Sequence, residues 1–161
     1  MKGTVHYEVK DGVAILTVDN PPVNPLSDGV RAGFVNNIDK AENDPDVLGV
    51  VLTGAGRSFI AGADISEFGK NPDGPGLDEA FRKLEFCSKP VVAAINGSAL
   101  GGGLETALVC NYRIAGPAAF VGLPEVNLGL LPGAGGTQRL PRLVGPAEAL
   151  KMMLTGMHVN A

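Results

Sequence analysis

The sequence has few of the residues that build disulfide frameworks, metal sites or catalytic triads. Its only cysteines are Cys87 and Cys110, without a C-x-x-C pair, and its only histidines are His6 and His158, near opposite ends. So little cysteine argues against a disulfide-stabilised secreted domain and favours a reducing compartment. Two distant histidines give little support to a hydrolase triad or a histidine-based metal site. We therefore expect no metal, and we interpret both thiols as small apolar core groups.

Long hydrophobic runs and clusters of positive charge are also missing. The longest purely apolar runs are about five residues, whereas a membrane helix needs about 20. The first residues, "MKGTVHYEVKDG", contain no apolar core of a signal peptide. The net charge of -4, without a lysine or arginine cluster, argues against nucleic-acid binding. We expect a cytoplasmic protein that binds neither membrane nor nucleic acid.

The composition predicts one folded unit. The chain has 161 residues, of which 45% are hydrophobic and 19% are charged, against roughly 25% charged residues in typical soluble domains. The 23 glycines and 12 prolines cluster between apolar runs, where they end one element and begin the next. We expect residues 1–161 to form a single domain or part of one, with some of the surface covered by another element or chain.

The first half of the chain alternates between strand and helix patterns. Two strands with Asp11-Gly12 between them predict a β-hairpin. A proline-rich loop, "NPPVNPLS", leads to a helix that Ser27 can cap. Two β-branched runs, at 48–54 and 90–97, predict strands buried on both faces. A helix is expected between them, at 77–87. This order is typical of an α/β fold.

The second half predicts shorter elements. We expect a helix after Gly103, short strands in "YRIAG" and "AAFVG", a loop through "LPEVNLGLLPGAGG", and a last helix that begins near Pro146. The chain ends at "HVNA", directly after that helix. We interpret this ending as a truncation.

The segment "GSALGGGLE" at 97–105 has three consecutive glycines just before a glutamate. It matches neither the G-x-G-x-x-G dinucleotide motif nor a P-loop, and the G-x-S-x-G motif fails because Asn96 replaces its first glycine. Glycines at the start of a helix let the backbone approach a ligand and leave N–H groups free to stabilise an oxyanion. Alternatively, Gly101–Gly103 only allow tight packing.

Two glutamates are candidates for proton transfer. Glu105, in "GLETALV", has apolar neighbours that would raise its pKa by desolvation; alternatively, it is a surface residue that complements the helix dipole. Glu125 follows Pro124 at the end of a predicted strand, again among apolar residues. Together they are a possible acid/base pair. The segment "FIAGADI" at 59–65 reads as a loop with exposed amides, in which Asp64 can cap a helix.

Three long segments are similar to one known family. "FIAGADISEF", "KPVVAAINGSALGGGLETALVCNYRIA" and "FVGLPEVNLGLLPGAGGTQRLPRLVG", in this order and spacing, resemble the enoyl-CoA hydratase/isomerase (crotonase) family. The wording is most similar to the N-terminal hydratase part of multifunctional fatty-acid oxidation enzymes. The similarity runs from about residue 5 to the end.

The resemblance implies a fold and an active site. The fold would be a crotonase-like spiral of ββα units that ends before the family's C-terminal helical segment, and full-length members usually form trimers or hexamers. The backbone amides of Ala63 and Gly102 match the family's oxyanion hole. Glu105 and Glu125 match the glutamates that hold and activate water in hydratases, with Glu125 chiefly the acid and Glu105 chiefly the base.

The resemblance also implies an acyl-CoA thioester substrate, with no metal or redox cofactor. Ala61, Ala63, Asp64 and Ile65 match a loop that contacts CoA. Pro25 stands where the family usually has alanine, which leaves the path of that loop open. The spacer "GKNPDGPG" at 69–76 would form a mobile wall of the acyl pocket.

Three functions stay open from the sequence. The first is reversible hydration of trans-2-enoyl-CoA in fatty-acid β-oxidation, within a longer parent chain that can carry fused dehydrogenase domains. The second is Δ3,Δ2-enoyl-CoA isomerisation. The third is a catalytically silent fragment that binds CoA or contributes only to assembly.

Overall fold

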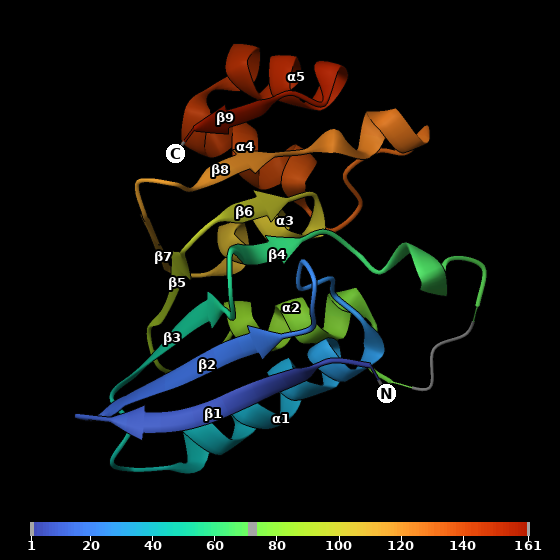
Figure 1. The fold of residues 1–161 in the computed structure, drawn as a ribbon. Helices are drawn as coiled ribbons and strands as arrows, with labels where there is room; N and C mark the ends of the chain where they lie inside the picture. Colours follow the sequence, from blue (N-terminus) through green and yellow to red (C-terminus); the bar gives the residue numbers. More distant parts are fainter. Residues whose placement is uncertain (1, 71–73, 161) are drawn as a thin grey trace.

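The chain builds two sheets by repeating one unit of two strands followed by a helix. The computed structural model describes residues 2–70 and 74–160. The first unit places both of its strands in a five-stranded sheet; in each later repeat the first strand joins that sheet, the second joins a four-stranded sheet, and a helix closes the unit. Figure 1 shows these units rising in a spiral from the N-terminal hairpin to the C-terminal helices. The predicted α/β spiral of ββα units is confirmed.

The five-stranded sheet contains the N-terminal hairpin and one strand from each repeat. Its order is β1 (Thr4–Lys10), β2 (Val13–Asp19), β3 (Gly49–Gly54), β5 (Val91–Ile95) and β7 (Tyr112–Ala115). All pairs are parallel except β1 with β2. The hairpin turn has positive φ at Asp11 (50°) and Gly12 (77°), as a two-residue type I′ turn requires. The hairpin prediction is therefore confirmed.

The four-stranded sheet and the helices complete the spiral. The smaller sheet has the order β4 (Ser58–Ala61), β6 (Ser98–Leu100), β8 (Phe120–Gly122) and β9 (His158–Asn160). The helices are α1 (Asp28–Asn43), α2 (Leu77–Glu85), α3 (Gly102–Val109), α4 (Gly136–Val144) and α5 (Pro146–Thr155). Two short 3-10 helices are η1 (Ile65–Glu67) and η2 (Pro124–Leu128).

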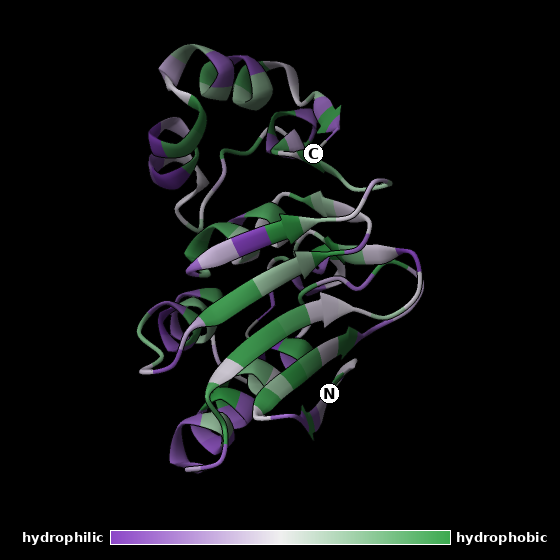
Figure 2. Ribbon diagram, turned by 90° about the vertical axis from the view of Figure 1, so that its left-hand side faces the viewer, coloured by the Kyte–Doolittle hydropathy of each residue, from purple (hydrophilic) through white to green (hydrophobic). Residues whose placement is uncertain are grey.

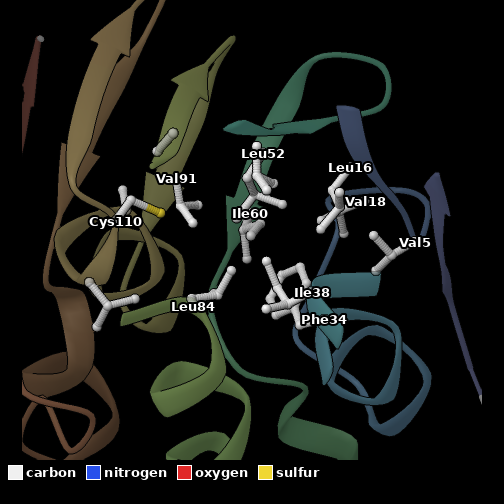
Figure 3. Packing of buried hydrophobic residues seen from close by; sticks show 14 of the residues in the cluster. Val5, Leu16, Val18, Phe34, Ile38, Leu52, Ile60, Leu84, Val91 and Cys110 are labelled. Carbon is white, nitrogen blue, oxygen red and sulfur yellow. The ribbon is translucent and has the colours of Figure 1, made fainter. Parts of the chain in front are cut away.

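The main core lies between the five-stranded sheet and the helices α1 and α2. Phe34 and Ile38 of α1 are fully buried and point towards the sheet, where they meet Leu16, Leu52 and their neighbours (Figure 3). In Figure 2 the strands are mostly hydrophobic, whereas the helices alternate between hydrophobic and hydrophilic residues. This alternation is typical of a helix that buries one face.

Two details of the sequence prediction are corrected. The strands β3 and β5 alternate between buried and half-buried residues, because α1 and α2 both pack on one side of the sheet (Figure 1); they are not buried on both faces. Ser27 occupies the N-cap position of α1 without a side-chain cap bond. Its hydroxyl instead donates to the carbonyl of Lys2 and accepts from Asn20 Nδ2.

Three short strands, the 3-10 helix η2 within the expected loop and one α-helix were not predicted from the sequence. The strands β4, β6 and β9 have only three or four residues, too few to show an alternating pattern. The segment 59–65 is therefore not a loop throughout, since β4 extends to Ala61. Helix α4 contains Pro141 and begins among glycines, features that normally predict a turn. Within residues 2–70 and 74–160, no helix is both long and apolar enough to cross a membrane.

Candidate active site

The segments singled out in the sequence meet at one cavity of about 740 Å³. Its walls come from the loop before α1, the segment after β4, the start of α3, η2 and the loop before α4. Ala63, Gly102, Glu105 and Glu125 all line it. Residues far apart in the chain are thus brought to one apolar pocket of the size that small ligands occupy.

The amides of Ala63 and Gly102 lie close together at this cavity. The carbonyl of Gly62 accepts a hydrogen bond from the Leu26 amide (2.9 Å). Because a trans peptide points its C=O and N–H in opposite directions, the Ala63 N–H faces away from Leu26. A Cβ added to Gly102 would lie 3.6 Å from the Ala63 nitrogen. Gly102 is the first residue of α3, so its N–H has no acceptor inside the helix.

Each of the three glycines is required for a different reason. Gly101 has a φ of 53°, a conformation that disfavours residues with a side chain. Gly102 faces the Ala63 amide, where a side chain would occupy the approach to both nitrogens. A side chain on Gly103 would collide with the carbonyl oxygen of Ile60 in β4. The packing role is confirmed for Gly103, and the ligand-binding role of Gly102 stays a prediction.

Glu105 is buried, which excludes the surface role. It is 3% exposed, and its Oε1 accepts hydrogen bonds from the amides of Ala134 (2.9 Å) and Gly136 (2.8 Å). Burial raises the pKa of its carboxyl, against the opposing effects of the two amide bonds and the positive charge of Arg139. A carboxyl with a raised pKa can exchange a proton closer to neutral pH.

Glu125 approaches the same cavity from the first turn of η2. Its Oε1 lies 3.0 Å from where a Cβ of Gly101 would be. Its Oε2 is buried and has no hydrogen-bond partner among the residues that the structure describes. Burial raises the pKa of this carboxyl, and the negative charge of Glu105 adds to the increase, against one bond from its own amide. The two glutamates thus line one cavity, and the charge of Glu105 acts on Glu125; their role as an acid/base pair stays a prediction.

The four residues matched to a CoA-contacting loop also line the cavity, namely Ala61, Ala63, Asp64 and Ile65. Asp64 is the N-cap of η1, where its carboxylate accepts from the Ser66 amide (2.9 Å), so the predicted cap is confirmed. Ile65 is 64% exposed. Their contact with CoA stays a prediction.

Pro25 and part of the spacer 69–76 both belong to the wall of the cavity. Pro25 lines the cavity, and its carbonyl accepts a bond from Asn20 Nδ2 (2.9 Å), which fixes the loop in place. Of the spacer, Gly76 lines the cavity, while residues 71–73 lie outside the described residues. The prediction of a mobile wall is not tested by this structure.

The two amides that hold Glu105 were missed in the sequence. Ala134 and Gly136 were assigned only to a loop. The available signal was the run of small residues in "GAGG", which lets two amides turn towards one acceptor. Its partner could not be inferred, because the contact between this turn and α3 is long-range.

Comparison with known proteins assigns the chain to a family. The model of the enoyl-CoA hydratase/isomerase family matches residues 8–161. The chain belongs to the enoyl-CoA hydratase/isomerase family. It is 54% identical over 156 residues to the peroxisomal bifunctional enzyme of Danio rerio, covering 96% of this chain and 22% of that protein.

Other members of the enoyl-CoA hydratase/isomerase family resemble the chain over a larger share of their own length. The probable enoyl-CoA hydratase of Bacillus subtilis is 47% identical over 163 residues, covering 97% of this chain and 63% of that protein. The crystal structure of enoyl-CoA hydratase from Bacillus anthracis superposes with a TM-score of 0.89 at 35% identity, covering 98% of this chain and 65% of that one. The chain thus spans less than two thirds of these relatives.

The comparisons leave location and cofactors as predictions. Some relatives carry peroxisomal or glyoxysomal names and others are bacterial, so the expected cytoplasmic location is not confirmed. In the part of the chain that the structure describes, no three histidine, cysteine, aspartate or glutamate residues gather as a metal site would need.

Proposed function

We propose that this family member catalyses the reversible addition of water to a trans-2-enoyl-CoA, giving a 3-hydroxyacyl-CoA, as a step of fatty-acid β-oxidation. The observation that carries the proposal is the convergence of two backbone amides, the buried Glu105 carboxyl and the half-buried Glu125 carboxyl on one apolar cavity. Hydratase names among the relatives support the same reaction class.

The amides of Ala63 and Gly102 would bind the thioester carbonyl oxygen. When water adds to the β-carbon, negative charge moves onto this oxygen and an enolate forms. Two fixed N–H donors in a cavity with little water stabilise that charge, and the start of α3 adds the positive end of its dipole. Loss of one such donor typically costs about 3 kcal/mol in the transition state.

The glutamates would carry the protons. Glu105 orients the water and accepts its proton as the oxygen bonds to the β-carbon. The α-carbon then takes a proton from Glu125, whose raised pKa favours the protonated form. The two amides at Oε1 of Glu105 fix its carboxylate and leave its other oxygen for the water. After product release, transfer of the proton from Glu105 to Glu125 restores the starting state.

Isomerisation is a second candidate, favoured by one observation. The Oε2 atom of Glu125 has no protein partner within the described residues, so this carboxyl alone could move a proton from C2 to C4 or the reverse. An isomerase would consume a 3-enoyl-CoA without water. A silent CoA-binding or assembly role would show binding without turnover of either substrate.

The wider setting of the site is also a proposal. Ala61, Asp64 and Ile65 would contact CoA where the cavity opens, and the CoA is part of the substrate, so no separate cofactor is needed. Assembly as a homotrimer or hexamer, and fusion to dehydrogenase domains, follow the family resemblance. Light scattering after size-exclusion chromatography measures the assembly.

The test measures hydration of crotonyl-CoA through the loss of its conjugated-thioester absorbance. We would compare the unaltered chain, Glu105→Gln, Glu125→Gln and the control Glu148→Gln, which changes a glutamate of similar charge on α5 whose side chain is 47% exposed. The two active-site variants should lose on the order of 100-fold or more in kcat, and the control should lose none.

Each alternative outcome has a separate meaning. Full activity of Glu105→Gln and Glu125→Gln would contradict the assigned roles. Turnover of a 3-enoyl-CoA but not of crotonyl-CoA would favour the isomerase. Binding of crotonyl-CoA without turnover by the unaltered chain would favour the silent role.

A further inference from the structure

An ion pair lies behind the turn that holds Glu105. Arg139 of α4 donates from Nη2 to both carboxylate oxygens of Glu85, at 2.7 and 2.8 Å. Glu85 is the last residue of α2, so the pair joins α2 to α4. The two side chains are 34% and 30% exposed. A partly buried arginine that contacts both carboxylate oxygens is held in a defined orientation.

Arg139 also contacts the turn directly. Its backbone N–H donates to the carbonyl of Gly135 (2.9 Å), and its Nη1 donates to the carbonyl of Ala134 (3.4 Å). Gly135 has a φ of 98°, and a side chain there would collide with the guanidinium of Arg139. The guanidinium therefore packs against the space that a side chain on Gly135 would occupy.

The same turn binds Glu105. The amides of Ala134 and Gly136, on either side of Gly135, both donate to Oε1 of Glu105. The turn is thus enclosed between the guanidinium of Arg139 and the carboxylate of Glu105. The turn that Arg139 contacts thus supplies both of these hydrogen bonds to the carboxylate of Glu105.

We propose that the Glu85–Arg139 ion pair is a positioning element for Glu105, which fixes the turn at 134–136 and supplies the positive charge that this buried carboxylate needs. The structural part of this inference is independent of the reaction; only its kinetic part rests on the proposed function. Neither residue lines the cavity, so both act through the turn and not on the substrate.

The charges around Glu105 support this role. Burial raises the pKa of Glu105, and the positive charge of Arg139 opposes that increase. Two carboxyls lie around this pair: Glu125 lines the same cavity from η2, where the charge of Glu105 raises its pKa, and Glu85 bonds to Arg139 from α2. Within the described residues, Arg139 is the cation whose charge favours the ionised form of Glu105.

Three variants separate charge from position. Arg139→Gln removes both the charge and the paired hydrogen bonds. Arg139→Lys keeps the charge but loses the two separate nitrogens that contact Glu85 and the Ala134 carbonyl. Glu85→Gln keeps the arginine and removes the negative charge beside it. Asp39→Asn is the control, since it breaks a Lys83–Asp39 ion pair that also involves α2 and does not contact the turn.

The first readout is the titration of the Glu105 carboxyl, followed by carbon-13 NMR in the unliganded chain and assigned with Glu105→Gln. Arg139→Gln should raise the pKa of Glu105, because the opposing positive charge is gone. Arg139→Lys should restore most of the difference. Glu85→Gln should lower this pKa, because the charge of Arg139 is then less compensated, and Asp39→Asn should leave it unchanged.

The second readout is kinetic. Arg139→Gln and Arg139→Lys should both reduce kcat for crotonyl-CoA on the order of 10-fold to 100-fold, as small displacements of catalytic groups do, with little change in KM. In Arg139→Gln the acid side of the kcat/KM profile should move to higher pH, because Glu105 must be ionised to accept a proton.

The proposal is wrong if Arg139→Gln lowers the melting temperature while the titration of Glu105 stays where it was. The proposal is also contradicted if Arg139→Lys and Glu85→Gln both behave like the control Asp39→Asn in the titration and in the kinetics. If Arg139→Gln does not fold, Arg139→Lys and Glu85→Gln provide the test. If the unaltered chain does not hydrate crotonyl-CoA, the proposed function fails while the NMR titration still tests the ion pair.

Discussion

Gly103 of α3 packs against the carbonyl oxygen of Ile60 in β4, so closely that a methyl group on the glycine would collide with it. One residue earlier, a methyl group on Gly102 would meet the end of the Leu26 side chain at 3.0 Å and the Ala63 nitrogen at 3.6 Å. Two adjacent glycines therefore differ: Gly103 allows close packing, and Gly102 is the one at which the proposed function needs the Ala63 amide to stay accessible.

This difference predicts that the same substitution mainly reduces stability at Gly103 and mainly reduces activity at Gly102. Gly103→Ala should lower the free energy of unfolding by about 3 kcal/mol or more, because backbone atoms must move to admit the methyl group. Gly102→Ala should cost less than about 1.5 kcal/mol, because the leucine side chain can shift, while crotonyl-CoA hydration falls. Urea denaturation and the hydration assay measure the two effects. Equal destabilisation by both variants would contradict the assignment.

The raised pKa values of the glutamates predict how stability depends on pH. Burial raises the pKa of Glu105 and Glu125 above their ordinary value of 4.5. At pH values between the unfolded and the folded pKa of each group, the folded chain therefore binds more protons than the unfolded chain. Their contribution is fully present below pH 4.5 and is lost as the pH rises through the folded pKa. Glu125→Gln should therefore be more stable than the unaltered chain near pH 8.

Melting temperatures at several pH values test this sign. The advantage of Glu125→Gln should shrink as the pH falls towards 4.5, since both chains are then neutral at this position. The control Glu148→Gln, at an exposed site, should show no such trend. An advantage that grows towards acid would mean that Glu125 has a lowered pKa in the folded chain.

The two thiols should react very differently. Burial raises the pKa of Cys110 to about 12, and this residue is 4% exposed. Cys87 is half-buried, and burial raises its pKa as well. Because the thiolate is the reactive form, iodoacetamide at pH 8 should label Cys87 slowly and Cys110 only after denaturation. Mass spectrometry locates the label, and Cys87→Ser serves as the control; labelling of Cys110 in the folded variant would contradict its burial.

Arg31 should be important for stability. Its side chain is 6% exposed and donates to Glu67 (2.8 Å) and to the carbonyls of Leu26 (2.7 Å) and Pro75 (2.7 Å). Arg31→Met leaves these acceptors without their donor, and loss of one member of a buried ion pair typically costs about 3–5 kcal/mol. Urea denaturation measures the cost. The exposed control Arg57→Met should change stability by less than about 0.5 kcal/mol, and a similar small change in Arg31→Met would contradict the prediction.

The longer elements could be predicted because their signals are local. The hairpin follows from Asp11-Gly12 between alternating strands, and α1 follows from apolar residues repeated every three or four positions. The short strands β4 and β6 have no such period, since each exists only because its neighbours in the smaller sheet supply hydrogen bonds. Helix α4 was missed for a related reason: Pro141 and the preceding glycines suggest a turn, and tertiary contacts override that preference.

The sequence by itself determined the kinds of groups at the site: a glycine run that opens a helix, two glutamates in apolar surroundings, and motifs that identify the family. Those properties depend on neighbours in the chain. Only the tertiary structure decided which atoms meet: that the Ala63 amide lies beside Gly102, that Glu105 is held by the turn at 134–136, and that Arg139 lies behind that turn. Such contacts arise from how the sheets and helices pack. They join segments that are distant in the chain, so no local pattern of the sequence indicates which segments will meet.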